Sequence, residues 1–357
     1  MAKQNNSVLQ ETKGNFKFIG IVENLDRQNA YSTGVTRAGK DYRRIAFSIR
    51  TSPNNSLRVE LFQQQPDNVY LYDTKNRKTV KKPYKNWEKN VDTWEKQNLQ
   101  IIGLNIRLGE KDDGVLRIPQ WDATQYLYDN LTNGDSVVVT GNTSFSTSTG
   151  NDGRKTTYKN FIINNVYKTS SPVDFGDENF KEVNDFQQQF VLVDTMEVED
   201  SDDVDVFTYI IDYNGNYTSV PFVIHTKDSK TMEKLAKAYS RLEFGTTIVA
   251  HGKVHNRAVE EQVEPLDDGD EMMLALMGDD DPMETITTYI NELEIRGTAK
   301  STKKRQNIEI GKYDESDFTD EDDTDIFATV DEDDLDEDFL GEESDDDFDS
   351  DELPFDM

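Results

Sequence analysis

The chain has 357 residues, of which 34% are hydrophobic and 31% charged, and its formal net charge is −32. This length accommodates two ordinary domains and a further segment that does not fold. The sequence holds no cysteine, which excludes disulfides, thiolate zinc sites and a cysteine nucleophile. The polar start Met1–Lys13 and the lack of 18 consecutive apolar residues predict a cytoplasmic protein without a membrane partner.

The negative charge is distributed unevenly along the chain. Residues 1–168 hold 25 basic and 17 acidic side chains (+8), and residues 169–312 hold 14 and 30 (−16). Residues 313–357 hold 24 acidic side chains and no basic one (−24). The basic first part favours a polyanionic partner, whereas the last part cannot bury enough apolar surface to fold alone. Counting by region therefore leaves nucleic acid open as a partner.

Alternating apolar and polar residues predict strands in the first half. The segment Arg43–Arg50 places its apolar side chains on one face and Arg44 and Arg50 on the other. The segment Leu57–Gln63 repeats this pattern and leaves Phe62 on the polar face, without an obvious core role. Both segments are typical of half-buried strands.

A helix and two more strands are predicted next, over Gln120–Thr132, Gly134–Gly141 and Thr156–Tyr167. The apolar stripe of this helix consists of Ala123, Leu127 and Leu131.

The second half repeats this order. Its predicted elements are the strands Phe190–Glu197, Asp205–Ile211 and Tyr217–His225, a helix over Ser229–Glu243 capped by Asp228, and the strands Gly245–Gly252 and Thr288–Ile295. The equal separation of the glycine pairs Gly134/Gly141 and Gly245/Gly252 indicates a duplicated domain. Five strands with a helix between the third and fourth form the layout of the OB-fold, a barrel that binds oligonucleotides on one face.

We therefore predict a mainly β protein with two tandem OB-like, five-stranded barrels, each with one helix. The expected organisation is a flexible N-terminus (1–15), a basic domain (16–168) with an insertion (73–98), a linker (169–185), an acidic domain (186–297) with an insertion (257–285), and a disordered acidic tail (298–357).

The chain ends in Asp351-Glu352-Leu353-Pro354-Phe355, after which Asp356 and Met357 follow. Together with the strand order and the basic, aromatic first half, this ending resembles bacterial and bacteriophage single-stranded DNA-binding proteins, whose tails end in Asp-Asp-Asp-Ile-Pro-Phe. The resemblance implies a non-enzymatic protein that coats single-stranded DNA (ssDNA) in replication, recombination and repair. Leu353, Pro354 and Phe355 would form the tip that contacts partners. A phage origin would place the protein in the cytoplasm of an infected bacterium.

Single-stranded DNA offers one phosphate and one exposed base per nucleotide, so its binders interleave cations and aromatic rings along a groove. The predicted second and third strands and the loop before them supply Arg37, Lys40, Tyr42, Arg43, Arg44, Arg50, Arg58 and Phe62. The first insertion, flanked by Tyr70 and Tyr72, supplies Arg77, Lys78, Lys81, Lys82, Tyr84, Lys85, Trp87 and Trp94, and is predicted to close over the strand as a flap.

The last strand of the first half adds Tyr158 and Lys159. For each of these residues the competing interpretation is a solvated loop or a hydrophobic core. For Phe47 and Trp121 the core interpretation is preferred, because both lie on apolar stripes.

The acidic tail is predicted to occupy the basic groove when DNA is absent and to recruit a polymerase, helicase or recombinase when DNA displaces it. A tail that only keeps the protein in solution is the simpler alternative.

Two other functions compete with ssDNA binding. The acidic chain could mimic DNA and sequester a basic partner, although the +8 first half argues against this. A metal-dependent nuclease would need carboxylates from separate strands to converge. Among the histidines, His251 and His255 on one strand would lie roughly 13 Å apart, too far to share a metal. No phosphate-binding loop or catalytic triad is apparent, so we predict no catalytic, cofactor or metal site. The sequence leaves the oligomeric state open.

Overall fold

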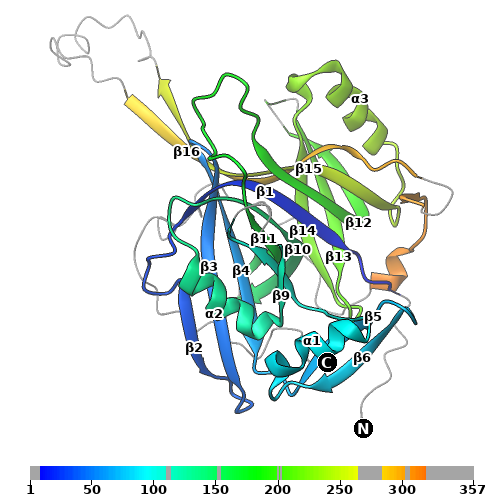
Figure 1. Cartoon of the computed structure of the whole chain (residues 1–357). Helices are drawn as coiled ribbons and strands as arrows, with labels where there is room; N and C mark the ends of the chain where they lie inside the picture. Colours follow the sequence, from blue (N-terminus) through cyan, green and yellow to red (C-terminus); the bar gives the residue numbers. More distant parts are fainter. Residues whose placement is uncertain are drawn as a thin grey trace, which may run out of the picture.

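The structure is a computed structural model that describes residues 9–109, 114–150, 154–198, 201, 203–263, 284–301 and 306–318. It is mainly β, as predicted from the sequence (Figure 1). A 14-stranded mixed sheet contains most of the strands, and a separate 3-stranded sheet lies beside it. The predicted tip at Leu353, Pro354 and Phe355 and most of the insertion 257–285 lie outside the described residues.

Five strands of the first half pair in a closed circuit. They are β1 (Gly14–Glu23), β3 (Asp41–Ser52), β4 (Asn55–Gln64), β11 (Lys155–Lys168) and β10 (Ser136–Thr149), and β10 pairs with β1 to close the ring. The β4–β11 pairing is parallel and the others are antiparallel. Helix α2 (Gln120–Asn130) precedes β10, and its predicted stripe is buried.

The second half forms a second closed circuit with the same order. Its strands are β12 (Val183–Glu197), β13 (Val204–Ile211), β14 (Tyr217–Ile224), β16 (Glu284–Thr298) and β15 (Thr247–Val263). The single parallel pairing is again between the third and fifth strands, β14 and β16. The 3-10 helix η3 (Thr226–Asp228) and helix α3 (Lys230–Tyr239) precede β15.

The start of α3 differs from the prediction. Ser229, not Asp228, is the capping residue, because its side chain accepts a hydrogen bond from the backbone N–H of Met232. The helix also ends four residues earlier than predicted.

The two glycine pairs occupy equivalent positions in the two circuits. Gly134 and Gly245 have positive φ angles of 93° and 77° in the turns that lead into β10 and β15. Gly141 and Gly252 lie at register shifts of these strands, and an added Cβ would be 1.8 Å and 1.7 Å from the backbone oxygens of Ile162 and Glu294. Both positions therefore exclude a side chain for the same steric reason.

The remaining elements of the first half extend its circuit or form a separate unit. Strands β2 (Tyr31–Val35), β8 (Leu104–Arg107) and β9 (Leu116–Ile118) extend the large sheet. Strands β5 (Asn68–Asp73), β6 (Lys78–Pro83) and β7 (Leu99–Ile101) form the small sheet in the order β6-β5-β7. The 3-10 helix η1 (Trp87–Asn90) and helix α1 (Val91–Lys96) lie between β6 and β7.

The insertion 73–98 is thus folded, and together with β5 it forms one unit; its closure over a bound strand as a flap stays a prediction. Trp87 and Trp94 are each only 7% exposed and belong to the same core as Leu71 and Ile101. Burial of these two large rings stabilises the small sheet against the first circuit.

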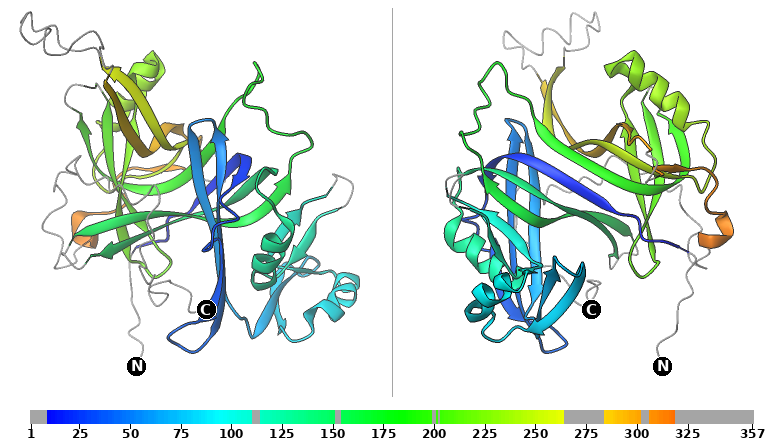
Figure 2. Two further views of the ribbon diagram at one scale, coloured as in Figure 1. Left: turned by 90° about the vertical axis from the view of Figure 1, so that its left-hand side faces the viewer. Right: turned by 45° about the vertical axis from the view of Figure 1, so that its right-hand side comes forward.

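The two circuits contact each other directly. Strands β1 and β12 pair antiparallel (Figure 2). Phe16 lies opposite Phe186 in this pairing. The Asn55 side chain donates to the carbonyl of Val254 (3.0 Å) and accepts from the N–H of Asn256 (2.8 Å), and both of these residues belong to β15. In the other direction, the Lys159 ammonium of β11 donates to the carbonyl of Asn291 on β16 (2.8 Å). The first circuit therefore contacts the β15–β16 hairpin of the second circuit at two places, once through β4 and once through β11.

The predicted tail boundary at residue 298 is too early. Strand β17 (Ile308–Glu309) pairs with β15, and the 3-10 helix η4 (Glu315–Phe318) follows. Phe318 is 8% exposed and packs against the rings of Tyr209 (4.8 Å), Tyr217 (5.2 Å) and Tyr313 (5.7 Å). Burial in this aromatic cluster offsets the unfavourable density of negative charge, so residues 306–318 belong to the folded part.

The N-terminal segment is also folded before residue 15. The backbone N–H of Thr12 donates to the carbonyl of Ile211 (2.9 Å), and the Thr12 hydroxyl accepts from the N–H of Ile211 (2.8 Å). The backbone N–H of Gln10 donates to the Tyr313 hydroxyl (3.1 Å). Both ends of the described chain therefore cover the same face of the second circuit.

Candidate nucleic-acid interface

The outer face of β3 and β4 carries the predicted aromatic pair. Alternation along the strands turns Ile45 and Leu61 into the core of the first circuit and Tyr42 and Phe62 outward. The two outward rings stack with their centroids 5.5 Å apart and their planes inclined by 26°. Both side chains are half-buried, so each ring is supported by its neighbour and keeps part of its surface in solvent. The structure brings together on one surface two residues that lie 20 positions apart.

Cations surround this aromatic pair. The Arg44 guanidinium forms an ion pair with Glu60 (2.8 Å). Arg58, two residues before Glu60 on β4, is exposed. The pKa of Arg58 is lowered by desolvation and by the neighbouring charges of Arg44 and Arg27, while Glu60 acts in the opposite direction. The surface thus carries more positive than negative charge at this point, and an incoming phosphate would relieve the repulsion among the arginines.

Two more predicted cations lie at the edge of this face. Arg37 and Lys40 are exposed in the turn between β2 and β3, where Gly39 has a φ of 78°. Arg50, at the other end of β3, is held by Glu23 (3.1 Å) and lies over the Phe175 ring (5.2 Å). Arg50 therefore has a structural contact of its own.

Arg43 and Tyr84 face inward and contact α2. The Arg43 guanidinium lies 4.4 Å from the centre of the Trp121 ring and donates to the Trp121 carbonyl (3.2 Å). The Tyr84 hydroxyl donates to Asp122 (2.6 Å), and burial together with this hydrogen bond raises the pKa of Tyr84. Desolvation by burial also raises the pKa of the Asp122 carboxyl. The Arg43 contacts attach β3 to α2, and the Tyr84 hydrogen bond attaches the chain after β6 to the same helix.

Several other predicted site residues are buried or engaged elsewhere. Trp87 and Trp94 are buried, so neither indole faces solvent in this structure. Phe47 and Trp121 are buried as well, in agreement with the preferred core interpretation.

The cations of the β5–β6 hairpin are mostly exposed. Arg77 lies in its turn with a φ of 53°, and Lys78, Lys81 and Lys85 are exposed while Lys82 is half-buried. These residues lie on the small sheet and not on the β3–β4 face.

Tyr158 and Lys159 differ from each other although they are adjacent. Tyr158 is 50% exposed on β11. Lys159 reaches across to β16, and desolvation lowers its pKa to about 8 against the opposing effect of Glu292. Lys159 is therefore a contact between the two circuits, which sequence spacing could not reveal.

Sequence reasoning missed a polar ladder on the outer face of β8, β9 and β11. Arg117 donates to Asn105 (2.7 Å), Asn105 to Asn165 (2.6 Å), and Asn165 to Thr140 (2.7 Å). The short strands β8 and β9 carry too few residues to show a period, so only the pairing of β8 with β11 brings these side chains together.

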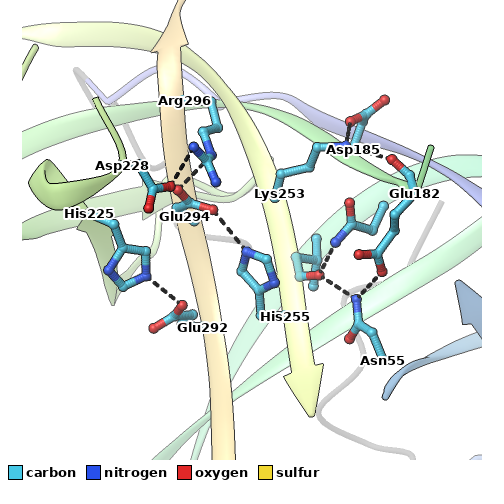
Figure 3. Close-up of polar contacts among 12 residues, drawn as sticks. Asn55, Glu182, Asp185, His225, Asp228, Lys253, His255, Glu292, Glu294 and Arg296 are labelled. Carbon is cyan, nitrogen blue, oxygen red and sulfur yellow. Dashed lines mark hydrogen bonds and ion pairs between the residues drawn. The ribbon is translucent and has the colours of Figure 1, made fainter. Parts of the chain in front are cut away.

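Two of the three histidines, His225 and His255, lie in ion pairs within the second circuit (Figure 3). His225 lies 2.8 Å from Glu292 and 3.1 Å from Asp203, and these carboxylates raise its pKa to about 9. His255 lies 2.9 Å from Glu294, which is 1% exposed and also pairs with Arg296 (2.6 Å). Among the described residues, no group of three or more His, Asp and Glu side chains is arranged to hold a metal ion.

A comparison of the sequence with models of known protein families identifies the family of this chain. The model of the YorF family matches residues 115–333, more than half of the chain. The chain belongs to the YorF family. The YorF match starts just before β9 and α2, includes β10 and β11, and spans the whole second circuit. Strands β1 to β8, with the Tyr42–Phe62 face, precede the part of the chain that matches the YorF model.

No curated protein matches this YorF-family chain in sequence. Among solved structures, the wild-type single-stranded DNA-binding protein from Thermus aquaticus is similar, with a TM-score of 0.37, 10% identity and coverage of 82% of this chain and 95% of that chain. A deletion mutant of that protein gives a TM-score of 0.35 with the same identity and coverage. No helix in the described part of the chain is long and apolar enough to cross a membrane.

Proposed function

We propose that this protein binds single-stranded DNA through the outer face of β3 and β4. The observation that carries the proposal is the stacked, solvent-facing pair of Tyr42 and Phe62 on the same β3–β4 face as Arg58, a face edged by Arg37 and Lys40. Aromatic rings stack on bases of any sequence, and each stacked base contributes about 1–3 kcal/mol, while the cations bind phosphates.

We interpret each closed circuit as an OB-fold barrel. Five strands with a parallel pairing of the third and fifth, and a helix before the fourth, agree with that fold. OB-folds bind oligonucleotides on the face of their second and third strands, which are β3 and β4 in the first circuit. The equivalent glycines support the duplication inferred from the sequence.

We assign the second circuit a different role. Its outer face around Tyr209 and Tyr217 is covered by residues 9–12 and 308–318, and its sequence is acidic. This covered face is not open to a base in the way that Tyr42 is. The second circuit would instead position the first one and fix the start of the acidic tail.

For the acidic tail we propose, as from the sequence, that it occupies the basic face when DNA is absent. Residues 319–357 carry 21 acidic side chains and no basic one, which suits competition with DNA for the basic face. When DNA displaces the tail, Leu353, Pro354 and Phe355 would contact a polymerase, helicase or recombinase, as the resemblance to phage and bacterial proteins implies. A role in phage replication, recombination and repair remains part of this proposal.

The test is a titration of a fluorescein-labelled oligo-dT with the full-length protein, followed by anisotropy at several salt concentrations. Intrinsic fluorescence is unsuitable, because Trp87, Trp94 and Trp121 are all buried. We expect salt-sensitive binding that the double variant Y42A/F62A weakens by about 10-fold or more. Tyr213 is 46% exposed in the turn after β13, so Y213A is the matched control and should bind like the wild type.

A truncation tests the tail separately. The chain must be cut after Phe318, because an earlier end would remove a buried ring from the second circuit. Competition by the tail predicts tighter DNA binding by the truncated protein, whereas unchanged affinity would leave the tail only a solubilising role. If the full-length and truncated proteins both fail to bind at low salt, ssDNA binding is refuted and the DNA-mimic interpretation takes its place. Loss of the oligonucleotide upon addition of Mg²⁺ would indicate a nuclease.

A further inference from the structure

The small sheet has one buried face and one open face. Val69, Leu71, Leu99 and Ile101 point into the core together with Trp87 and Trp94. Helix α1 lies beside the sheet, next to β7 (Figure 1). Because side chains alternate along a strand, the neighbours of these buried residues must point to the opposite face.

Three large apolar side chains gather on the open face. Tyr70 and Tyr72 of β5 are 38% and 40% exposed, and Ile102, just after β7, is 49% exposed. The N–H of Ile102 donates to the carbonyl of Tyr70, so these residues are neighbours. Exposing a large apolar side chain to water is unfavourable, so folding alone does not explain a cluster of them on the surface.

The charge around this cluster is positive. Lys81 lies opposite Tyr70 on β6, with its ammonium 6.0 Å from the centre of the ring. Arg117 reaches the edge of the sheet through hydrogen bonds to Gln100 (2.9 Å) and Asn105 (2.7 Å). The carboxylate of β5, Asp73, is 7% exposed and accepts hydrogen bonds from the N–H groups of Lys75 and Asn76.

We propose that this open face, with Tyr70 and Tyr72 at its centre and Lys81 and Arg117 at its edge, is a second binding site for single-stranded nucleic acid. Residues two apart on a strand place their side chains roughly 7 Å from each other on one face, a spacing that suits two successive bases of an extended strand. Open sheets that carry exposed aromatics on neighbouring positions bind splayed bases in this way. The cations would hold the phosphates on either side.

A docking site for a protein is the competing interpretation, and the charge distribution argues against it. The centres of protein interfaces are depleted of lysine, whereas Lys81 lies directly over the central tyrosine. The inference rests on the proposed function, because it assumes that a strand bound at the β3–β4 face continues over a second surface of the same molecule.

The experiment compares oligo-dT of about 10 and about 40 nucleotides, since one OB-fold covers about 4–16 nucleotides. The variant is Y70T/Y72T in the full-length protein, because threonine keeps the strand propensity of this position while removing the rings. We expect unchanged affinity for the short oligonucleotide and at least 5-fold weaker binding of the long one. Y128A is the matched control, because Tyr128 is 43% exposed on α2.

Equal affinity of Y70T/Y72T and wild type for both lengths would overturn the second site while leaving the proposed function intact. Failure of the wild type to bind either length would refute the proposed function and the second site together. Equal weakening for both lengths would also refute a separate second site, because the tyrosines would then belong to the first. As a readout independent of affinity, ultraviolet cross-linking of long bromodeoxyuridine-substituted DNA should label the peptide with Tyr70 and Tyr72, and its absence there counts against the inference.

Discussion

The charge of His225 should make the stability of the second circuit dependent on pH. The imidazole lies between Glu292 and Asp203, and these hydrogen bonds raise its pKa from the ordinary 6.5 to about 9. A pKa that is higher in the folded state adds stability that is complete below pH 6.5 and is lost as the pH rises through about 9. Replacing His225 with Gln, which carries no charge, should remove this dependence.

The expected magnitude follows from the size of the shift. One pKa unit corresponds to about 1.4 kcal/mol, so the rise from 6.5 to about 9 amounts to roughly 3 kcal/mol at full effect. The His225 side chain is 28% exposed, and solvent screens part of its attraction to the carboxylates. We therefore expect the wild type to lose about 2 kcal/mol more than H225Q between about pH 6 and about pH 10.

Two groups near His225 also have shifted pKa values, and their contributions to the pH dependence of stability must be separated from that of His225. Lys159, close to Glu292, has its pKa lowered to about 8 by desolvation. Its contribution has the opposite sign, because the penalty for holding the charged form disappears above that pH. The pKa of the Asp205 carboxyl is raised by burial and by the charges of Asp203 and Glu292. Both groups remain in H225Q, so the difference between wild type and variant isolates His225.

The assay is urea unfolding followed by circular dichroism at about pH 6, 8 and 10. The exposed His251, on β15, provides the matched control H251Q. If wild type and H225Q lose the same stability over this range, the imidazole does not stabilise the circuit through its charge, and the pKa assignment is refuted.

Three further outcomes test other features of the fold. G141A and G252A should each destabilise the protein by about 2–3 kcal/mol in urea unfolding, because the new methyl would overlap a backbone oxygen, whereas G176A should have little effect. F318A should lower the stability of the second circuit by about 3 kcal/mol and expose residues 306–318 to proteolysis; unchanged digestion would refute the anchoring role. N55A should cost about 1–3 kcal/mol by leaving the Glu182 and Val254 acceptors without this donor, and hydrogen exchange at β15 should rise; equal exchange would refute the contact.

Sequence patterns predicted the regular parts of the fold because they depend on local period. The alternation around Phe47 and the helical stripe through Leu127 express which face is buried, and the structure buries both residues. The outward position of Phe62 followed from the same alternation, although its stacking on Tyr42 did not. These features require only the geometry of one element.

The features that the sequence did not predict depend on contacts between distant segments. Trp87 resembled a flap residue because its neighbours are lysines, yet its ring is buried in the core with Leu71 and Ile101. From the sequence Lys159 was predicted to bind phosphate, but in the structure its ammonium donates to the carbonyl of Asn291 on β16. Phe318 lay in an acidic run, and its packing against rings such as Tyr209 and Tyr217 explains why it folds there. In each case the decisive partner lies far away along the chain.

Phe318 also fixes where the rest of the chain can go. Beyond it 39 residues remain, and at roughly 3.5 Å per residue they reach no further than about 140 Å from this point, whatever their conformation. That radius includes the chain's own β3–β4 face and would include the same face of an adjacent molecule. Since Gln10 contacts Tyr313 at the same place, a tag fused to the N-terminus would be attached close to the point where the C-terminal residues begin. An affinity tag for the binding experiments is therefore best cleaved off before DNA is added.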